Sequence, residues 1–205
     1  MALTARSIVT LAKLKLYLGA SANADVDTTL ETWIDLVSGS IEEYCQCKFQ
    51  PIQITGEILD GSGYWYLEPR FSPIVSTSIA ATTDIQYRDQ GAPTTWIDLV
   101  DSINDIYVDT VMPWRIELIE GDYFPKGTKN IKLNYIAGYT TMPADVEKVC
   151  MEMVQKMWDE SKSGGDRLGV ASENVQSIAG GAGSRTYENI SAQHKQVLNR
   201  FRRIL

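Results

Sequence analysis

The sequence has few of the side chains from which metal sites and many catalytic sites are built. It contains a single histidine and three cysteines, and Cys45 and Cys47 lie two positions apart on a predicted helix, so they point to different sides. No second cysteine pair is present that would complete a zinc site. We therefore expect no metal and no cofactor, and we expect Cys45, Cys47 and Cys150 to be buried or partly buried free thiols.

The sequence also has no long apolar run, because none approaches the roughly 18 residues that a membrane-spanning helix needs. The N-terminal stretch carries charges among its apolar positions and has no clean signal-peptide centre or cleavage site. We expect a protein that is made in the cytoplasm and stays there until it joins an assembly. Its formal net charge of −7 argues against tight binding to duplex DNA, because such binding depends on lysine and arginine neutralising phosphates.

Motifs for enzymatic chemistry are sparse as well. His194 lies on the apolar stripe of a predicted terminal helix, and no GxSxG motif is present to supply a serine nucleophile. The glycines at 180–183 lack the Lys-Ser/Thr ending of a phosphate-binding loop. Carboxylates are dense from Asp101 to Asp122, where a solvated acidic face and a paired-acid hydrolase site are the two readings. We expect no enzyme, and the hydrolase is kept as an alternative function.

What is present is an ordinary globular composition over 205 residues, 44% hydrophobic and 22% charged. Apolar residues spaced three and four apart predict helices that each present one apolar face. Gly19 is expected to end the first of them and Pro51 the second. The predicted helices are Thr4–Leu18, Val26–Phe49, Pro143–Glu160 and Tyr187–Leu205.

Between the second and third helices, short β-type runs alternate with turn residues. No long helical pattern separates these runs, so antiparallel hairpins are expected rather than parallel strands joined by helices. Turns are expected at residues 61–63, 89–91 and 126–128, where glycine is present. The predicted strands are Gln53–Leu59, Tyr64–Leu67, Ile85–Arg88, Trp96–Val100, Tyr107–Val108, Arg115–Ile119 and Ile131–Tyr135.

Together these segments predict an α+β fold, in which a helical bundle built from both ends of the chain carries an inserted antiparallel β lobe. Residues 161–185 are rich in glycine and serine and are expected to be flexible in the isolated chain. The expected divisions are 1–50 for the N-terminal helices, 51–140 for the β lobe, 141–163 for the core helix, and 164–205 for the linker and C-terminal helix.

Two features of the sequence indicate contacts with partners. The run Tyr64-Trp65-Tyr66 places two aromatic side chains on one side of a strand and one on the other, and either an interface or the core of the lobe explains it. The terminal helix joins an apolar stripe to a basic face. That combination is typical either of cations opposing the negative end of a helix or of a segment that docks on a partner.

Two motifs bracket the chain. One is Tyr135-Ile136-Ala137-Gly138-Tyr139, a short polar turn, and Pro143-Ala144-Asp145-Val146 before a long helix. The other is Lys15-Leu16-Tyr17-Leu18-Gly19, then acidic and small residues, then a helix ending Ile41-Glu42-Glu43-Tyr44-Cys45 with Phe49-Gln50-Pro51. Their order and spacing resemble the head–tail connector (adaptor) family of tailed bacteriophages. The resemblance covers roughly the first fifty residues and the chain from Asn134 onward.

This resemblance implies a structural virion protein at the head–tail interface. In the family, subunits form a ring, usually dodecameric, that docks on the portal protein, extends the DNA channel and offers an attachment surface to the next neck or tail protein. DNA would pass through without sequence-specific binding, and no membrane is involved. Contacts with the portal or with neighbouring subunits are expected at Val197, Leu198, Arg200, Phe201, Arg202 and Arg203. The acids Asp105, Asp109, Glu117 and Glu120 are expected to face the channel.

Another ring-forming neck or tail-completion protein, a stopper or a terminator, is the alternative within the same class. The helices on both sides of the β lobe favour the adaptor, since β-barrel cores are expected in the other two.

Overall fold

The computed structural model of the chain has an α+β fold with helices at both ends and antiparallel sheets between them, as the sequence predicts. The chain forms two compact units. Met1–Cys45 and Met142–Arg202 make the helical unit, and Gln46–Thr141 with Arg203–Leu205 make the β lobe. The residues described are 3–4, 6–19, 24–88, 95–101, 105–108, 113–119, 122–162, 170–173, 185–187 and 190–203.

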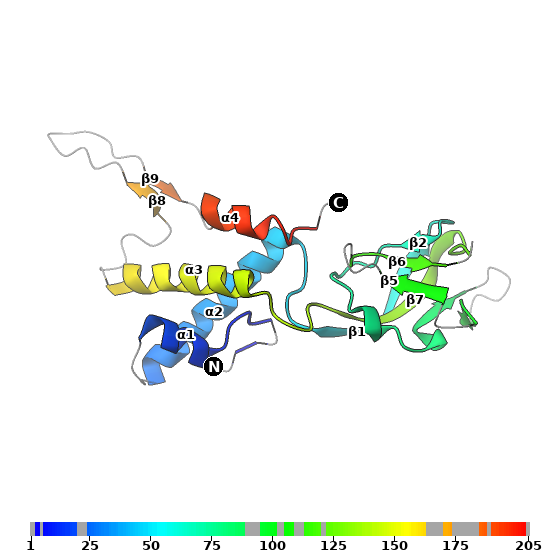
Figure 1. Cartoon of the computed structure of the whole chain (residues 1–205), viewed down its shortest axis with the longest axis horizontal. Helices are drawn as coiled ribbons and strands as arrows, with labels where there is room; N and C mark the ends of the chain where they lie inside the picture. The colour runs from blue at the N-terminus through cyan, green and yellow to red at the C-terminus, as the bar shows by residue number, and fades with distance from the viewer. Residues whose placement is uncertain are drawn as a thin grey trace. The chain divides into compact units, whose positions relative to one another are not determined.

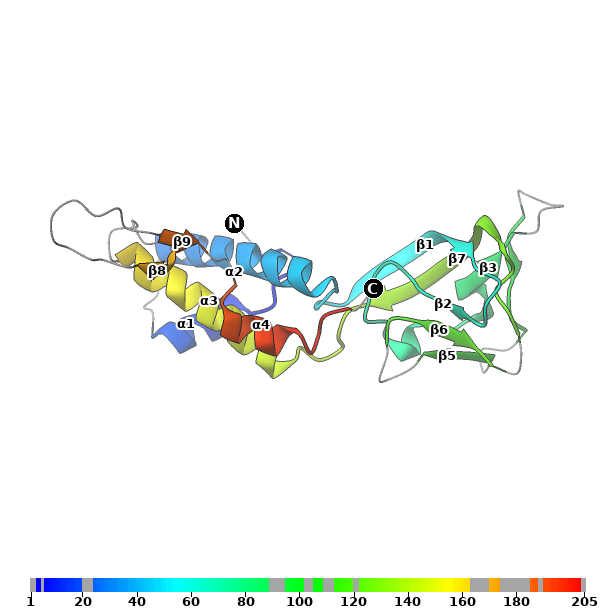
Figure 2. The same cartoon turned by 90° about the horizontal axis from the view of Figure 1, so that it is seen from above.

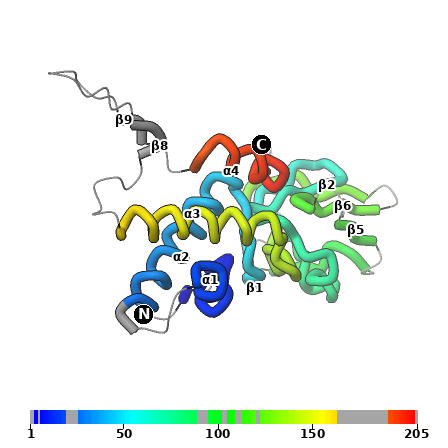
Figure 3. The backbone as a smooth tube through the Cα atoms, turned by 60° about the vertical axis from the view of Figure 1, so that its left-hand side comes forward, coloured from blue at the N-terminus to red at the C-terminus, as the bar shows by residue number. Residues whose placement is uncertain are grey.

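The helical unit is organised around two long helices that pack against each other, α2 and α3. The shorter helices α1 and α4 lie on opposite sides of α3 (Figures 1 and 3). Each helix buries a single apolar stripe, as its spacing predicts. The helices are α1 (Leu11–Leu18), α2 (Ala24–Cys45), α3 (Ala144–Lys162) and α4 (Ala192–Leu198). Their core includes Leu14, Leu30, Ile34, Val37, Ile41, Val146, Val149, Cys150, Val154 and Leu198.

The first helix begins later than predicted. The Thr10 side chain accepts a hydrogen bond from the Lys13 backbone N–H and so caps the helix one residue before its start. Ile8, which belongs to the predicted stripe, is buried ahead of the helix, and its backbone N–H donates to Ser38 Oγ at 3.0 Å. The segment therefore buries the expected side chain in a non-helical conformation.

The second helix ends earlier than predicted, at Cys45 rather than Phe49. Gln46 has φ 55°, a left-handed conformation that stops a helix. Phe49 is fully buried after the helix has ended, and its ring stacks on Tyr139 with the ring centres 5.7 Å apart. The apolar spacing continues past the helix because Phe49 is buried against Tyr139 instead.

The fourth helix is much shorter than predicted. Ser191 caps it, with its side chain accepting from the His194 backbone N–H. After Leu198 the N–H groups of Arg200 and Phe201 bond to carbonyls three residues back, which is the tighter turn that closes many helices. The arginines near the C-terminus therefore lie beyond the helix and do not form its polar face.

The β lobe consists of two antiparallel sheets (Figure 2). One has the strand order β1-β7-β3-β4 and the other the order β2-β6-β5. The strands are β1 (Ile52–Gly61), β2 (Tyr66–Leu67), β3 (Ile85–Tyr87), β4 (Ile97–Asp98), β5 (Ile106–Val108), β6 (Ile116–Leu118) and β7 (Gly127–Ala137). The prediction of antiparallel hairpins is confirmed, and each predicted strand overlaps an observed one. β1 and β7 extend beyond both predicted ends, and β5 begins one residue before its predicted start.

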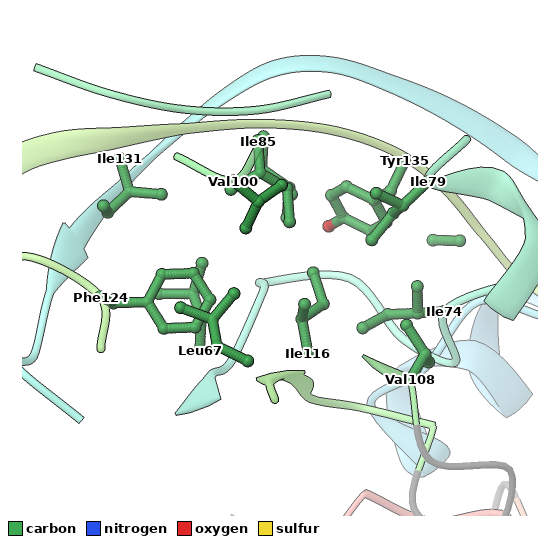
Figure 4. Packing of buried hydrophobic residues seen from close by; sticks show 13 residues of the cluster. Leu67, Ile74, Ile79, Ile85, Val100, Val108, Ile116, Phe124, Ile131 and Tyr135 are labelled. Atoms are coloured by element: carbon green, nitrogen blue, oxygen red, sulfur yellow. The ribbon is translucent and has the colours of Figure 1, made fainter. Parts of the chain in front are cut away.

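The two sheets pack face to face around one apolar core (Figure 4). Side chains of β3 and β7, among them Ile85 and Ile131, meet side chains of β2, β5 and β6, among them Leu67 and Ile116. Tyr135 is fully buried in this core, where its hydroxyl donates to Glu57 Oε2 at 2.7 Å. Since both inner faces are covered, the outer faces of the two sheets lie on opposite sides of the lobe.

The ends of the lobe are joined by its longest pair of strands. β1 and β7 run antiparallel, and Ile52 at the beginning of the lobe pairs with Ala137 at its end. The adjacent Gly138 has φ 120°, and its N–H donates to the Pro73 carbonyl at 2.8 Å. The chain therefore enters the lobe and leaves it at adjacent positions.

The sequence predicts a turn at residues 126–128, but β7 begins at Gly127. A Cβ on Gly127 would lie 2.8 Å from Asn130 Nδ2, so glycine allows a close approach there. Asn130 is buried, donates to the Pro125 carbonyl at 2.7 Å and accepts from the Gly61 N–H at 2.8 Å. This asparagine therefore joins three segments of the lobe.

Two predictions concern segments that lie wholly or largely outside the described residues. One is the turn at 89–91, and the other is the flexibility of residues 161–185. Within the segment 161–185 and just after it, the structure describes an antiparallel pair, β8 (Val170–Glu173) and β9 (Arg185–Tyr187), that the sequence analysis did not anticipate.

Candidate interaction surfaces

The six predicted interface residues of the C-terminal segment have different surroundings. Leu198 is fully buried in the helical unit, and its carbonyl lies 3.7 Å from Cys45 Sγ. Next to it, Asn199 Oδ1 accepts from the Tyr44 hydroxyl at 2.7 Å. Val197 and Phe201 are half-buried. This chain therefore already covers much of the apolar stripe that the sequence analysis assigns to a partner.

The three arginines of the segment also differ. Arg200 is 73% exposed and lies 3.7 Å from the exposed carboxylate of Asp145, while the exposed Arg202 stands over the Tyr44 ring. Arg203 belongs to the β lobe, where its side chain is only 8% exposed. Its guanidinium donates to the carbonyls of residues 69 and 70 at 2.9 and 3.0 Å. Arg200 and Arg202 are thus the members of the predicted set that remain accessible to a partner.

His194 is a partly buried histidine held within the helical unit. Its Nε2 lies 3.2 Å from Glu152 Oε2, and Lys148 lies 3.7 Å from the other oxygen of the same carboxylate. The ring is therefore held inside the helical unit, in agreement with its place on the predicted apolar stripe.

The predicted channel-facing acids divide into two pairs. Asp109 and Glu120 lie outside the described residues. Asp105 immediately precedes β5, and its backbone carbonyl accepts from the Ile119 N–H at 2.8 Å. Glu117 lies on the outer side of the β2-β6-β5 sheet, where its carboxylate forms an ion pair with Arg115. A paired carboxylate presents less negative charge to a phosphate backbone than a free one.

The sheet β2-β6-β5 carries a group of aromatic side chains on its outer side. Leu67, Ile116 and Val108 are buried in one cross-strand row, so the neighbouring row must point outward. That row is Tyr66, Glu117 and Tyr107. We call the outer surface formed by Tyr64, Trp65, Tyr66, Tyr107, Arg115, Glu117 and Ile119 the aromatic face.

Rings on the aromatic face are packed against each other. Tyr64 stacks on Tyr66 with ring centres 5.8 Å apart, and Trp65 meets the Tyr66 ring edge-on at 5.4 Å. The Arg115 guanidinium lies 5.4 Å from the Trp65 ring centre and 5.8 Å from that of Tyr66. Tyr64, Trp65 and Tyr107 remain 58%, 41% and 46% exposed. The run of three aromatics is therefore a surface cluster and not part of the lobe's core.

The sequence indicates the cluster Tyr64-Trp65-Tyr66 but not the rest of the aromatic face. Tyr107 lies in β5 and Arg115 immediately precedes β6, and only the pairing β2-β6-β5 brings them to the three aromatics. The signal that could have found Arg115 and Glu117 is the alternation in Arg115–Ile119, where an apolar residue separates the two charged ones.

Burial affects two titratable groups strongly. It raises the pKa of the Cys150 thiol from 9.0 to about 12, and a hydrogen bond with Ser38 opposes part of that rise. It also raises the pKa of Tyr135 well above its usual value, with the Glu57 carboxylate adding to the effect. Cys45, Cys47 and Cys150 are all buried free thiols, which confirms the prediction made for them.

Two kinds of site are not found in the described part of the chain. There, no group of three or more histidine, cysteine, aspartate or glutamate side chains could hold a metal ion. Among the same residues, every helix is too short or too polar to cross a membrane.

Comparison with known proteins gives a result at the level of fold. No family model and no curated protein matches the sequence. The whole chain aligns with 95% of a chain from the neck of an empty GTA particle computed with C6 symmetry, with 13% identity and a TM-score of 0.56. The whole chain also aligns with 95% of a chain from the virion of the native gene transfer agent (GTA) particle, with 13% identity and a TM-score of 0.55.

A third structure is the neck of the native GTA particle computed with C12 symmetry. This chain aligns over its full length with 94% of a chain there, with 12% identity and a TM-score of 0.54. The protein therefore shares its fold, helices and lobe together, with chains of these particles.

Proposed function

We propose that this chain is a structural neck protein of a phage-like particle, and specifically a head–tail connector (adaptor) subunit. Copies would form a ring, a dodecamer on the virion, that docks on the portal protein, extends the DNA channel and provides the attachment surface for the next neck or tail protein. The observation that carries this proposal is the fold shared along the entire chain with neck chains of GTA particles.

Residues of both connector motifs have structural roles in the fold. Gly138 closes the lobe beside Pro51, because a Cβ there would come within 2.8 Å of the Pro51 nitrogen. The helix that follows this glycine, α3, packs on α2, and the last residues of α2 belong to the other motif. The two motifs thus form the frame that links the helical unit to the lobe along the chain.

Portal binding is assigned in this proposal to the C-terminal segment. Arg200 and Arg202 are exposed cations that a negatively charged partner surface would attract. Val197 and Phe201 supply half-buried apolar surface beside them. The role of the four acids at the channel stays a prediction, and the ion pair of Glu117 argues against it at that position.

The test is native mass measurement and negative-stain imaging of the full chain, alone and mixed with the portal ring from the same source. A ring, or a monomer that forms a ring only on the portal, is the expected result. A ring that ignores the portal would point to a stopper or terminator. A chain that stays monomeric under both conditions would refute the proposal.

A further inference from the structure

Exposed apolar surface in the β lobe is concentrated on the side that bears the aromatic face. Tyr64, Trp65, Tyr107 and Ile119 are each at least 40% exposed. Tyr123 is 62% exposed, and the residue after it bonds through its N–H to the Tyr64 carbonyl. At about 100 Å² each, these five side chains expose about 500 Å², more than half of the roughly 800 Å² that one partner buries in a stable interface.

The aromatic face is built like the centre of a protein interface. Tyrosine, tryptophan and arginine dominate interface energetics, and here the rings and Arg115 already hold each other in place. Side chains that are fixed before binding lose little conformational entropy when a partner arrives. Stacking also covers one side of the Tyr66 ring, so the cluster is less suited to a flat ligand than to a protein surface.

The opposite side of the same lobe has a different character. On the outer side of the β1-β7-β3-β4 sheet, Ile58, Lys132, Gln86 and Asp98 form one cross-strand row. Ile58 is 43% exposed. We call the surface formed by these four residues with Arg88 and Trp96 the Lys132 face.

Cations gather at the centre of the Lys132 face. The Lys132 ammonium and the Arg88 guanidinium lie 5.8 and 5.2 Å from the centre of the Trp96 ring. On the aromatic face, by contrast, Arg115 is paired with Glu117, which leaves the tyrosine rings. The Asp98 carboxylate of the Lys132 face is already bonded by Gln86 Nε2 and Thr82 Oγ1. Aromatic rings attract cations, so the tyrosines of one face complement Lys132 and Arg88 of the other.

We propose that the aromatic face of one copy packs against the Lys132 face of the next copy in the ring. The inference rests on the proposed function insofar as it takes the chain to be a ring subunit. Because the two faces lie on opposite sides of one lobe, each copy has both halves of the contact. A contact between two different faces is head-to-tail, which is the type that builds rings of many subunits.

Cross-linking with introduced cysteines tests this contact, since the three native cysteines are buried. The full chain carrying both Tyr107→Cys and Ile58→Cys is treated with a short bis-maleimide, alone and with the portal ring. A ladder of dimers, trimers and larger species is expected, and each single variant should stay uncross-linked. The matched control pairs Tyr107→Cys with Leu36→Cys, which is 58% exposed on α2 and should give no ladder.

Two results would overturn the contact. Dimers from Tyr107→Cys alone would show that two aromatic faces meet each other. The absence of cross-links from the pair, and from a second pair with Gln86→Cys in place of Ile58→Cys, would show that the faces do not meet. Circular dichroism confirms beforehand that each variant is folded.

Native mass measured in parallel separates this inference from the proposed function. A ring without a ladder would retain the connector and refute this contact. A ladder whose species grow larger without closing into a ring would support the contact and refute the ring. The variant Tyr107→Ser should weaken self-association about tenfold or more, as expected of a central tyrosine.

Discussion

Three arginines in the four positions from 200 to 203 show that the surroundings of a residue decide its role. Arg203 is a structural residue of the β lobe, whereas Arg200 and Arg202 are exposed on the helical unit. In the sequence the three are equivalent, because nothing local distinguishes a buried guanidinium that binds two carbonyls from an exposed one.

The accessible pair provides the sharper test of portal binding. Replacing Arg200 and Arg202 by alanine should reduce affinity for the portal ring by about tenfold or more, because two charges of the predicted contact are removed. Binding is measured by co-sedimentation at two salt concentrations. The control, Lys148→Ala with Lys126→Ala, removes two exposed cations elsewhere and should bind normally. Equal affinity for both variants would remove the C-terminal segment from the proposal.

At Cys150, burial links a single thiol to stability at high pH. The folded thiol has a pKa of about 12, and the unfolded one titrates near 9.0, so the unfolded chain loses the proton first. Stability is therefore fully present below about pH 9 and falls as the pH rises from there toward 12, by at most about 1.4 kcal/mol per pH unit from this group.

Urea unfolding between about pH 8 and about pH 10 measures this slope. The variant Cys150→Ala should lose stability less steeply with pH than the wild type, although it is less stable overall. Tyr135 adds a loss of the same sign at still higher pH in both proteins. Identical slopes would contradict the assignment to Cys150.

Among the elements, the turn that closes the lobe depends on one glycine. Gly138 has a positive φ, and a Cβ there would lie 2.3 Å from the Gln50 carbonyl oxygen. Gly138→Ala should lower the free energy of unfolding by more than about 1 kcal/mol, because the backbone must move. Thermal unfolding measures the loss. Gly39→Ala, in the interior of α2 with no contact closer than 3.6 Å, should be neutral or stabilising.

Helix α4 is held to the helical unit by its last residue. Leu198 is fully buried, so Leu198→Ala should cost about 2–5 kcal/mol, whereas Val197→Ala at the half-buried neighbour should cost less. Chemical denaturation compares the two. If the costs were equal and small, α4 would be a free docking segment, and deleting Ser184–Leu205 would be a clean test of portal binding.

How well each element can be predicted depends on how far apart in the sequence its interacting residues lie. Alternation and spacing located the long helices and every strand of the lobe, because these depend on neighbours a few residues apart. The length of α4 was missed because the stripe continues to Phe201 while the hydrogen bonds change after Leu198. The aromatic face was missed in part because Tyr66, Glu117 and Tyr107 meet only through strand pairing.

At the scale of the whole molecule, each of the two units has a core of its own. A fragment of residues 46–141 should therefore fold alone, with a cooperative thermal transition and a β-type circular dichroism spectrum. It should be somewhat less stable than the lobe in the full chain, because it lacks the hydrogen bonds of Arg203. An unfolded fragment would show that the lobe needs the helical unit.

The pairing of Ile52 with Ala137 has a consequence for how such proteins diversify. Since the lobe begins and ends at adjacent positions, its length can change by whole hairpins without altering the path of the chain between α2 and α3. One lobe can then be replaced by another during evolution while the helices stay the same. We expect chains with the same helical frame to carry lobes of unrelated size and sequence, and the junction at 51–52 and 137–138 to accept foreign domains in the laboratory.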